Sequence, residues 1–293
     1  MRFLTSLVLI AAWTAFQALA ADEPPKEWID PDTGHRVVRL SDEPGSESFY
    51  FNINPFTPDG KTMVFTSPTG ICAIDLATRK IDKVVEGQRL HVIMVGRKTG
   101  AVYYSQRGGV FSADPQTKAA RKIAELPAGS RVSAVNCDET LLAGTAVILN
   151  EEQLKEEQAR LENLESNSDS ARKNRARNIQ QRFEKHLPME LFFLNVATGE
   201  TKRFARGTDW LNHLLFSPSD PNLLMFCHEG PWHKVDRIWL IRSDGSELRN
   251  IHKRTMNMEI AGHEFWGGDG RTAWYDLQTP RGEDFWVAGY DVA

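Results

Sequence analysis

The stretch Thr57-Pro58-Asp59-Gly60, followed by alternating apolar residues from Thr62 to Thr66, decides the fold. Pro, Asp and Gly favour a tight turn, and the alternation after them indicates a half-buried β-strand. The pattern returns at intervals of about forty residues, and Gly60 and Gly100 are corresponding positions. Later copies have their turns at Asp138-Glu139, at Ser217-Pro218-Ser219-Asp220 and at Gly268-Asp269-Gly270.

Each repeat holds about four short strands, and a period near forty residues with four strands is typical of a β-propeller blade. A β-sandwich has strands of similar length, but it would not repeat its turn chemistry at one fixed period. We therefore predict an all-β β-propeller domain over residues 46–293. The fifth repeat stops at Val292-Ala293, where an outermost strand would follow, so about five blades are expected.

One segment interrupts the repeats between residues 150 and 187. It is highly charged, acidic in its first part and basic in its second, with apolar residues at helical spacing in both. Ser166-Asn167-Ser168-Asp169 separates the two parts. The pattern predicts a helical hairpin with a solvated charged surface, inserted into the third repeat.

Residues 1–20 have the features of a secretory signal peptide. Arg2 provides a short basic region, Phe3 to Trp13 are apolar, and Ala18-Leu19-Ala20 matches a cleavage site that would leave Ala21 as the mature start. No later apolar run is long enough to cross a membrane. We expect a periplasmic or secreted protein with no membrane partner, in which residues 21–45 form an N-terminal lead-in.

The charge and the cysteines limit the other classes of function. A formal net charge of −4 and a pI near 6.1 provide no global basic field, which argues against nucleic acid as a partner. The three cysteines (Cys72, Cys137 and Cys227) are odd in number and far apart. They predict buried thiols in strands and not a disulfide framework.

The residues that could carry chemistry are concentrated between Met225 and Trp266. Five of the eight histidines lie in this stretch or just before it, together with several charged residues (His213, His228, His233, His252, His263, Glu229, Arg237, Glu259 and Glu264). The spacing of His228 and His233 is not that of a helical zinc-protease motif, and Pro231 would interrupt such a helix. Nucleophile-elbow, phosphate-loop and paired CxxC motifs are absent. A single histidine is more often a hydrogen-bonded loop residue than a catalyst, and a strand arginine often pairs with a carboxylate.

Four motifs occur in an order that resembles the oligogalacturonate lyase family: Cys227-His228-Glu229-Gly230-Pro231, Val235-Asp236-Arg237-Ile238-Trp239-Leu240, Asp244-Gly245-Ser246 and Gly262-His263-Glu264-Phe265-Trp266. Phe49-Tyr50-Phe51 and the stretch from Asn195 to Glu200 are also similar. The resemblance runs from about Tyr50 to the end of the chain.

The resemblance implies a seven-bladed propeller that cleaves short oligogalacturonides, which are acidic pectin fragments, by β-elimination. It implies that His263 is the base that removes the proton at C5. It further implies that Arg237 binds the substrate carboxylate and stabilises the developing anion. His228, Glu229 and His213 are assigned to substrate binding.

The family resemblance also implies a divalent metal, usually Mn²⁺, whose ligands would lie on later blades beyond the position of Ala293. A chain without those ligands is expected to be slow or inactive, because a metal Lewis acid contributes several kcal/mol. Two other hypotheses remain open. One is a non-catalytic, TolB-like periplasmic propeller that binds proteins, and the other is a pseudoenzyme that binds acidic sugars through Arg237 and surface aromatic residues.

Overall fold

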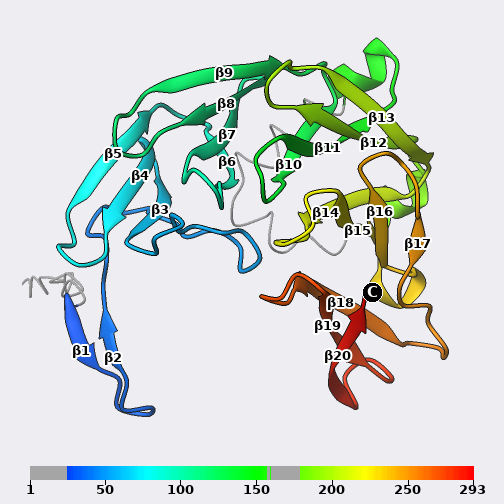
Figure 1. Cartoon of the computed structure of the whole chain (residues 1–293). Coiled ribbons are helices and arrows are strands. Elements are labelled where there is room, and N and C mark those ends of the chain that lie inside the picture. Colours follow the sequence, from blue (N-terminus) through cyan, green and yellow to red (C-terminus); the bar gives the residue numbers. More distant parts are fainter. Residues whose placement is uncertain (1–24, 157–158, 160–178) are drawn as a thin grey trace, which may run out of the picture. The chain divides into compact units, whose positions relative to one another are not determined.

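A computed structural model describes residues 25–156, 159 and 179–293 and divides the chain into two compact units, Met1–Asp42 and Glu43–Ala293 (Figure 1). The described part of the first unit is a hairpin of β1 (Glu27–Ile29) and β2 (Arg36–Val38). The carboxylate of Asp30 closes its turn by accepting a hydrogen bond of 2.8 Å from the Thr33 backbone N–H. The predicted signal peptide, residues 1–20, lies outside the described residues.

The described strands of the second unit form five antiparallel sheets, each built from strands that are consecutive in the sequence. The first two sheets are β3 (Thr62–Ser67), β4 (Gly70–Asp75) and β5 (Ile81–Glu86), then β6 (His91–Val95), β7 (Val102–Gln106), β8 (Gly109–Ala113) and β9 (Ala120–Glu125). The third and fourth are β10 (Ser130–Val135), β11 (Leu141–Val147), β12 (Met189–Asn195) and β13 (Thr201–Gly207), then β14 (Trp210–Phe216), β15 (Leu223–Glu229), β16 (Ile238–Arg242) and β17 (Arg249–Asn250). The fifth is β18 (Ile260–Trp266), β19 (Thr272–Gln278) and β20 (Phe285–Asp291).

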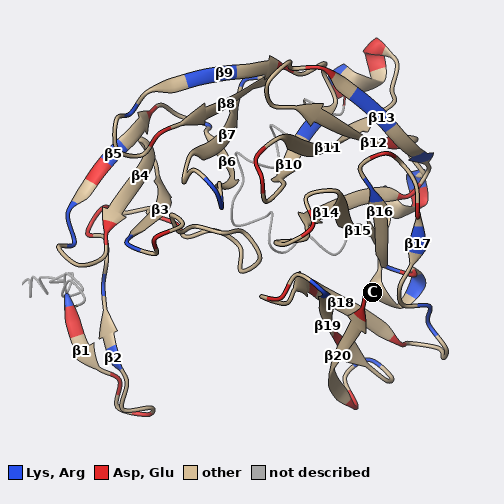
Figure 2. Cartoon of the chain, in the orientation of Figure 1, with Lys and Arg blue, Asp and Glu red and all other residues tan. Residues whose placement is uncertain are grey.

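The hydrophobic core of this unit lies between neighbouring sheets. Val64 of the first sheet packs with Val95 of the second, and four apolar clusters of this kind join the five sheets in order along the chain. Middle strands such as β4 and β12 are buried on both faces, whereas the outer strands β9 and β13 carry Lys and Arg toward solvent (Figure 2). Sheets that pack face to face with the inner strands β6, β10 and β14 side by side are propeller blades, which confirms the predicted fold class.

The turns between the inner strands also connect neighbouring sheets. The Glu139 carboxylate, in the turn after β10, accepts hydrogen bonds from the backbone N–H groups of Lys98 and Thr99 at 2.8 and 2.7 Å. It also accepts one from the Tyr103 hydroxyl at 3.0 Å, and burial together with this carboxylate raises the pKa of Tyr103. The turn motif therefore repeats because it forms contacts between blades as well as reversing the chain.

The structure refines two other predictions. Residues 151–156 and 179–185 are helical at the two ends of the predicted insert, while most of its middle lies outside the described residues. Cys72 and Cys227 are buried thiols in β4 and β15, as expected, but Cys137 is only partly buried and lies in the turn after β10. No described helix is long and apolar enough to span a membrane.

We predict that Glu139→Ala lowers the free energy of unfolding by about 2 kcal/mol, because it leaves the amide donors of the neighbouring turn and the Tyr103 hydroxyl without their acceptor. Urea unfolding followed by tryptophan fluorescence measures this change. Glu86→Ala, at the exposed end of β5, is the control and is expected to change stability little. Equal effects of the two substitutions would contradict the assigned role.

Candidate active site

Two inner strands place a histidine at the same position of a β-bulge. The register of β14 against β15 shifts after Asn212, and that of β18 against β19 shifts after Gly262. His213 and His263 follow directly, with φ of 47° and 48°. Such left-handed backbone is uncommon for residues other than glycine, and a bulge re-aims the side chain that it carries. A Cβ on Gly262 would lie 2.4 Å from the ring of Trp232, so glycine is needed for that ring to pack here.

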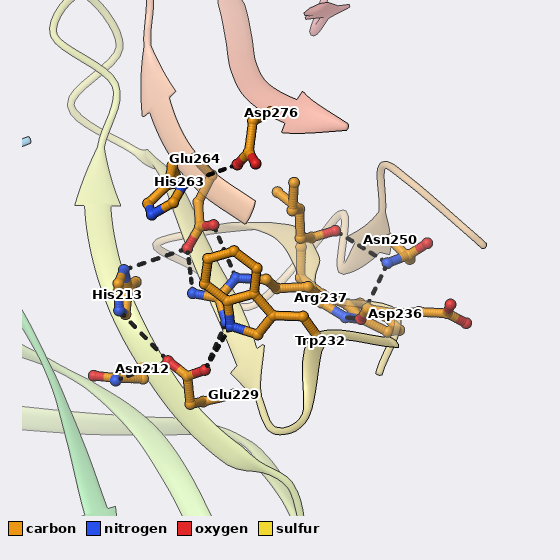
Figure 3. Close-up of polar contacts among 12 residues, drawn as sticks. Asn212, His213, Glu229, Trp232, Asp236, Arg237, Asn250, His263, Glu264 and Asp276 are labelled. Carbon is orange, nitrogen blue, oxygen red and sulfur yellow. Dashed lines mark hydrogen bonds and ion pairs between the residues drawn. The ribbon is translucent and has the colours of Figure 1, made fainter. Parts of the chain in front are cut away.

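Behind these histidines, Arg237 lies in a buried ion cluster (Figure 3). Its side chain is 1% exposed, and Nη1 donates a hydrogen bond of 2.7 Å to Glu229. Its Nε and Nη2 donate to the two oxygens of Glu264 at 3.0 and 3.2 Å. The Trp232 ring covers the guanidinium, with Cζ 4.9 Å from the ring centroid. We call Arg237, Glu229 and Glu264 the arginine cluster.

His213 bridges the two carboxylates of the arginine cluster. Its Nε2 lies 3.5 Å from Glu229 and its Nδ1 lies 3.5 Å from Glu264. Burial alone would raise the pKa of Glu229, but the charge and hydrogen bond of Arg237 outweigh burial and hold this pKa below its ordinary value. Two ionised carboxylates around one guanidinium leave one negative charge in excess. His213 thus lies between the two carboxylates that hold Arg237.

His263 lies on the open side of Trp232. Its side chain is 53% exposed, and its Nδ1 is 3.0 Å from the Asp276 carboxylate. The imidazole meets the Trp232 ring edge-on at 5.0 Å between centroids and the Phe51 ring at 6.2 Å. Because a carboxylate can only accept, Nδ1 donates to Asp276, and in the neutral imidazole Nε2 then holds the lone pair. His263 is thus an oriented base beside an open pocket of about 330 Å³, which is lined by Phe51, His263, Phe265, Tyr275, Asp276 and Val287.

His228 lies away from these groups, although it is adjacent to Glu229 in sequence. Successive residues of a strand point to opposite faces, so Glu229 points toward the arginine cluster and His228 points away from it. His228 stacks on Trp239, with ring centroids 4.6 Å apart, and its Nδ1 lies 3.1 Å from Asp209. This contact lowers the pKa of Asp209. The structure therefore brings together His213, Glu229, Arg237 and His263 of the predicted site residues, with His228 on the other face of the sheet.

Two further residues of the histidine-rich stretch have structural roles. The Glu259 carboxylate accepts hydrogen bonds from the Thr255 backbone N–H and hydroxyl, both at 2.8 Å, and contacts His252 at 2.7 Å. The other nitrogen of His252 lies 3.1 Å from the Tyr275 hydroxyl. This chain of contacts holds the loop before β18 against β19.

The sequence alone indicates no role for Trp232, Glu264 or Asp276. Glu264 follows His263 in the motif Gly262-His263-Glu264-Phe265-Trp266, and its place in that motif is the one feature of the sequence that points to it as a site residue. Asp276 lies on the neighbouring strand, and only the register, in which it faces Gly262, brings it to His263. The sequence position of Trp232 relative to Arg237 and His263 does not predict that its ring lies between them.

A metal centre does not fit the described residues. No group of three or more His, Cys, Asp or Glu side chains that could hold a metal ion occurs in the part of the chain that the structure describes. The two carboxylates nearest to His213 are already bound by Arg237.

The family model described as oligogalacturonate lyase matches residues 175–285, which include the arginine cluster, His213, His263 and Asp276. An oligogalacturonide lyase from Pectobacterium atrosepticum is 38% identical over 86 residues, which are 29% of this chain and 22% of that protein. The chain is a relative of the oligogalacturonate lyases.

A second lyase relative, from Dickeya dadantii, is 26% identical over 258 residues, which are 84% of this chain and 62% of that protein. The chain thus spans less than two thirds of the length of these two curated lyases. A solved oligogalacturonate lyase in complex with manganese superposes with a TM-score of 0.74 at 24% identity, over 91% of this chain and 69% of the other. A TolB-type structure from Agrobacterium tumefaciens reaches a TM-score of 0.54 at 14% identity, which supports the propeller fold alone.

For this lyase relative, we predict that Arg237→Ala lowers the free energy of unfolding by about 3–5 kcal/mol, because it leaves two carboxylates buried without their cation. Guanidinium chloride unfolding monitored by circular dichroism measures the loss. Arg271→Ala removes an exposed arginine whose partner is Asp291, and it is expected to have a much smaller effect. If both variants were equally stable, the arginine cluster would not be the stabilising feature described here.

Proposed function

We propose that this chain acts as an oligogalacturonate lyase, cleaving short oligogalacturonides by β-elimination. The observation that carries the proposal is the contact of His263 with Asp276 at the edge of an open, aromatic-lined pocket. This pair lies within the segment that matches the oligogalacturonate lyase family. The names of the Pectobacterium and Dickeya relatives support the same substrate class.

The reaction requires a base at C5 of a uronide. The proton at C5 is acidified by the adjacent carboxylate, and its removal allows the C4–O4 bond to break with formation of a C4–C5 double bond. The departing oxygen leaves with the neighbouring sugar and takes up a proton. Histidine suits the first step because its charge changes near neutral pH. In this proposal the Nε2 lone pair of His263 takes the C5 proton, and Asp276 stabilises the imidazolium that results.

The aromatic residues around His263 provide a surface for the sugar ring. Phe51 and Phe265 are exposed, and their rings meet edge-on with centroids 6.2 Å apart. Trp232 forms the wall between His263 and Arg237 (Figure 3). Apolar ring faces of this kind bind the C–H faces of sugars and exclude water from the base, which helps to orient the C5 proton toward Nε2.

Arg237 is assigned to the substrate carboxylate by family resemblance, and that role stays a prediction. In the structure its Nε, Nη1 and Nη2 donate to Glu264 and Glu229, behind Trp232. As arranged, Arg237 supports the site by fixing the two carboxylates that flank His213. For Arg237 to contact a substrate directly, the carboxylate of the uronide would have to replace that of Glu229 or Glu264 as its hydrogen-bond acceptor.

The proposal also includes export from the cytoplasm. The basic residue, apolar stretch and A-x-A sequence within residues 1–20 support a cleaved signal peptide. A periplasmic or secreted location would suit an enzyme that meets pectin fragments as they enter the cell.

The direct test measures the absorbance of the unsaturated uronide product from digalacturonate, with and without added Mn²⁺. We predict that His263→Ala lowers kcat by about 10²–10⁴-fold, because general base catalysis contributes that much. His35→Ala, in the hairpin of the other unit, is the matched control and is expected to retain full activity. An active protein that tolerates His263→Ala would exclude this residue as the base.

We further predict that Asp276→Asn lowers kcat by about 10²-fold while leaving KM and stability nearly unchanged. The amide keeps the size of the side chain but can donate to Nδ1, so it favours the tautomer in which Nε2 carries the proton. Initial rates across a range of digalacturonate concentrations separate kcat from KM. A rise in KM alone would show that Asp276 contacts substrate and does not orient the base.

Two results would favour the other hypotheses. Binding of digalacturonate with no product under any metal condition would indicate a pseudoenzyme that retains the sugar site. Neither binding nor product would leave a non-catalytic propeller as the better description.

A further inference from the structure

The helix at residues 179–185, which ends the predicted insert, packs on the strand hairpin that carries Glu229. The guanidinium of Arg182 lies over the Trp210 ring, with Cζ 4.5 Å from the ring centroid. Trp210 is the first residue of β14, and it pairs with Glu229, the last residue of β15. The helix therefore contacts the fourth sheet at the end where the arginine cluster begins.

The next residue of the helix, Phe183, packs against Gly230, which follows β15 and is buried. A Cβ at Gly230 would lie 3.0 Å from Cδ2 of Phe183 and 2.7 Å from Cγ1 of Val235, so a larger residue would displace one of them. Glycine thus allows the Phe183 ring to approach the backbone closely. The contact fixes the position at which the chain leaves β15.

Gly230 begins the loop of residues 230–237, which joins β15 to β16 and carries Trp232. The Trp232 ring covers the Arg237 guanidinium at 4.9 Å and meets the His263 ring at 5.0 Å. Its Nε1 donates a hydrogen bond of 3.3 Å to Glu229. Because Trp232 follows Gly230 by two residues in a close-packed region, a shift of Gly230 is expected to move the Trp232 ring.

The other end of this loop has a separate anchor. The backbone N–H and Nε of Arg254 each donate a hydrogen bond of 3.1 Å to the Asp236 carboxylate. Nη1 of Arg254 donates to the backbone carbonyl of His233. The loop is therefore held near Asp236 by polar contacts and at Gly230 by the Phe183 ring.

We propose that Phe183 is a positioning residue for the active site, because it fixes Gly230 and so holds Trp232 against His263. The catalytic consequence of this inference rests on the proposed function, whereas the position of Trp232 can be measured without catalysis. A misplacement of about 1 Å in a catalytic site can cost about 10²-fold in rate. The end of the insert then has a role in the site, in addition to the solvated surface that its charges predict.

The experiment combines fluorine NMR of the full chain, labelled with fluorotryptophan, with digalacturonate kinetics. The Trp232→Phe variant identifies the Trp232 resonance by its loss. The test variants are Phe183→Ala, Phe183→Val and Phe183→Leu. The control is Phe111→Ala, which removes a half-buried ring stacked on Tyr104 in the second sheet. Thermal unfolding gives the folded fraction of each variant, and kcat is expressed per folded chain.

We expect Phe183→Ala to shift or broaden the Trp232 resonance and to lower kcat about tenfold, which is within the cost of a misplacement of about 1 Å. Phe183→Leu should restore the resonance and most of kcat, because leucine still fills the space against Gly230. Phe111→Ala also loses packing, but it should leave the Trp232 resonance and kcat unchanged. The resonance of Trp286, an exposed ring on the fifth sheet, should not move in any variant.

An unmoved Trp232 resonance in Phe183→Ala, or an equal shift in Phe111→Ala, would overturn the inference and leave the proposed function intact. Phe183→Val is expected to show a smaller shift of the same resonance, and it replaces Phe183→Ala if that variant does not fold. If the unsubstituted chain forms no unsaturated product, the proposed function fails. The Trp232 resonance then still decides whether Phe183 positions that ring, so the two failures are distinguishable.

Discussion

The buried pairing of Arg237 with Glu229 and Glu264 is the interaction on which the rest of the site depends. It joins the fourth sheet to the fifth, because Glu229 ends β15 and Glu264 belongs to β18. Buried charges are tolerated only when they are paired and hydrogen-bonded, so each of the three groups fixes the position of the other two. Trp232 packs on Arg237 and His263 packs on Trp232, which connects the exposed histidine to the buried arginine cluster.

Much of the fold could be predicted because the blades repeat. The turn at Thr57-Pro58-Asp59-Gly60 and its later copies located the inner hairpins, and strand alternation located the apolar faces. The exceptions have local causes. Cys137 follows β10 in a turn and is only partly buried, and the predicted insert shows its helical ends while most of its middle lies outside the described residues.

The site was less predictable, because its contacts depend on register and on the face to which each strand residue points. His228 and Glu229 are neighbours in sequence, yet alternation sends them to opposite faces of β15. Asp276 belongs to no motif, and only the pairing of β18 with β19 brings it to His263. The family resemblance located His263 and Arg237, but it could not show that Trp232 lies between them.

The position of the long segment between β11 and β12 has an energetic consequence. These strands pair residue by residue from Leu141 with Asn195 to Val147 with Met189, although about forty residues separate their adjacent ends. The entropy lost on closing a loop grows only logarithmically, by about 0.6 kcal/mol for each doubling of length. Replacing a short hairpin turn by this segment therefore lowers the free energy of unfolding by about 2 kcal/mol. Burial of the middle strands β11 and β12 can offset this loss. The end of this blade could thus gain a large addition during evolution without any change in how its strands pair.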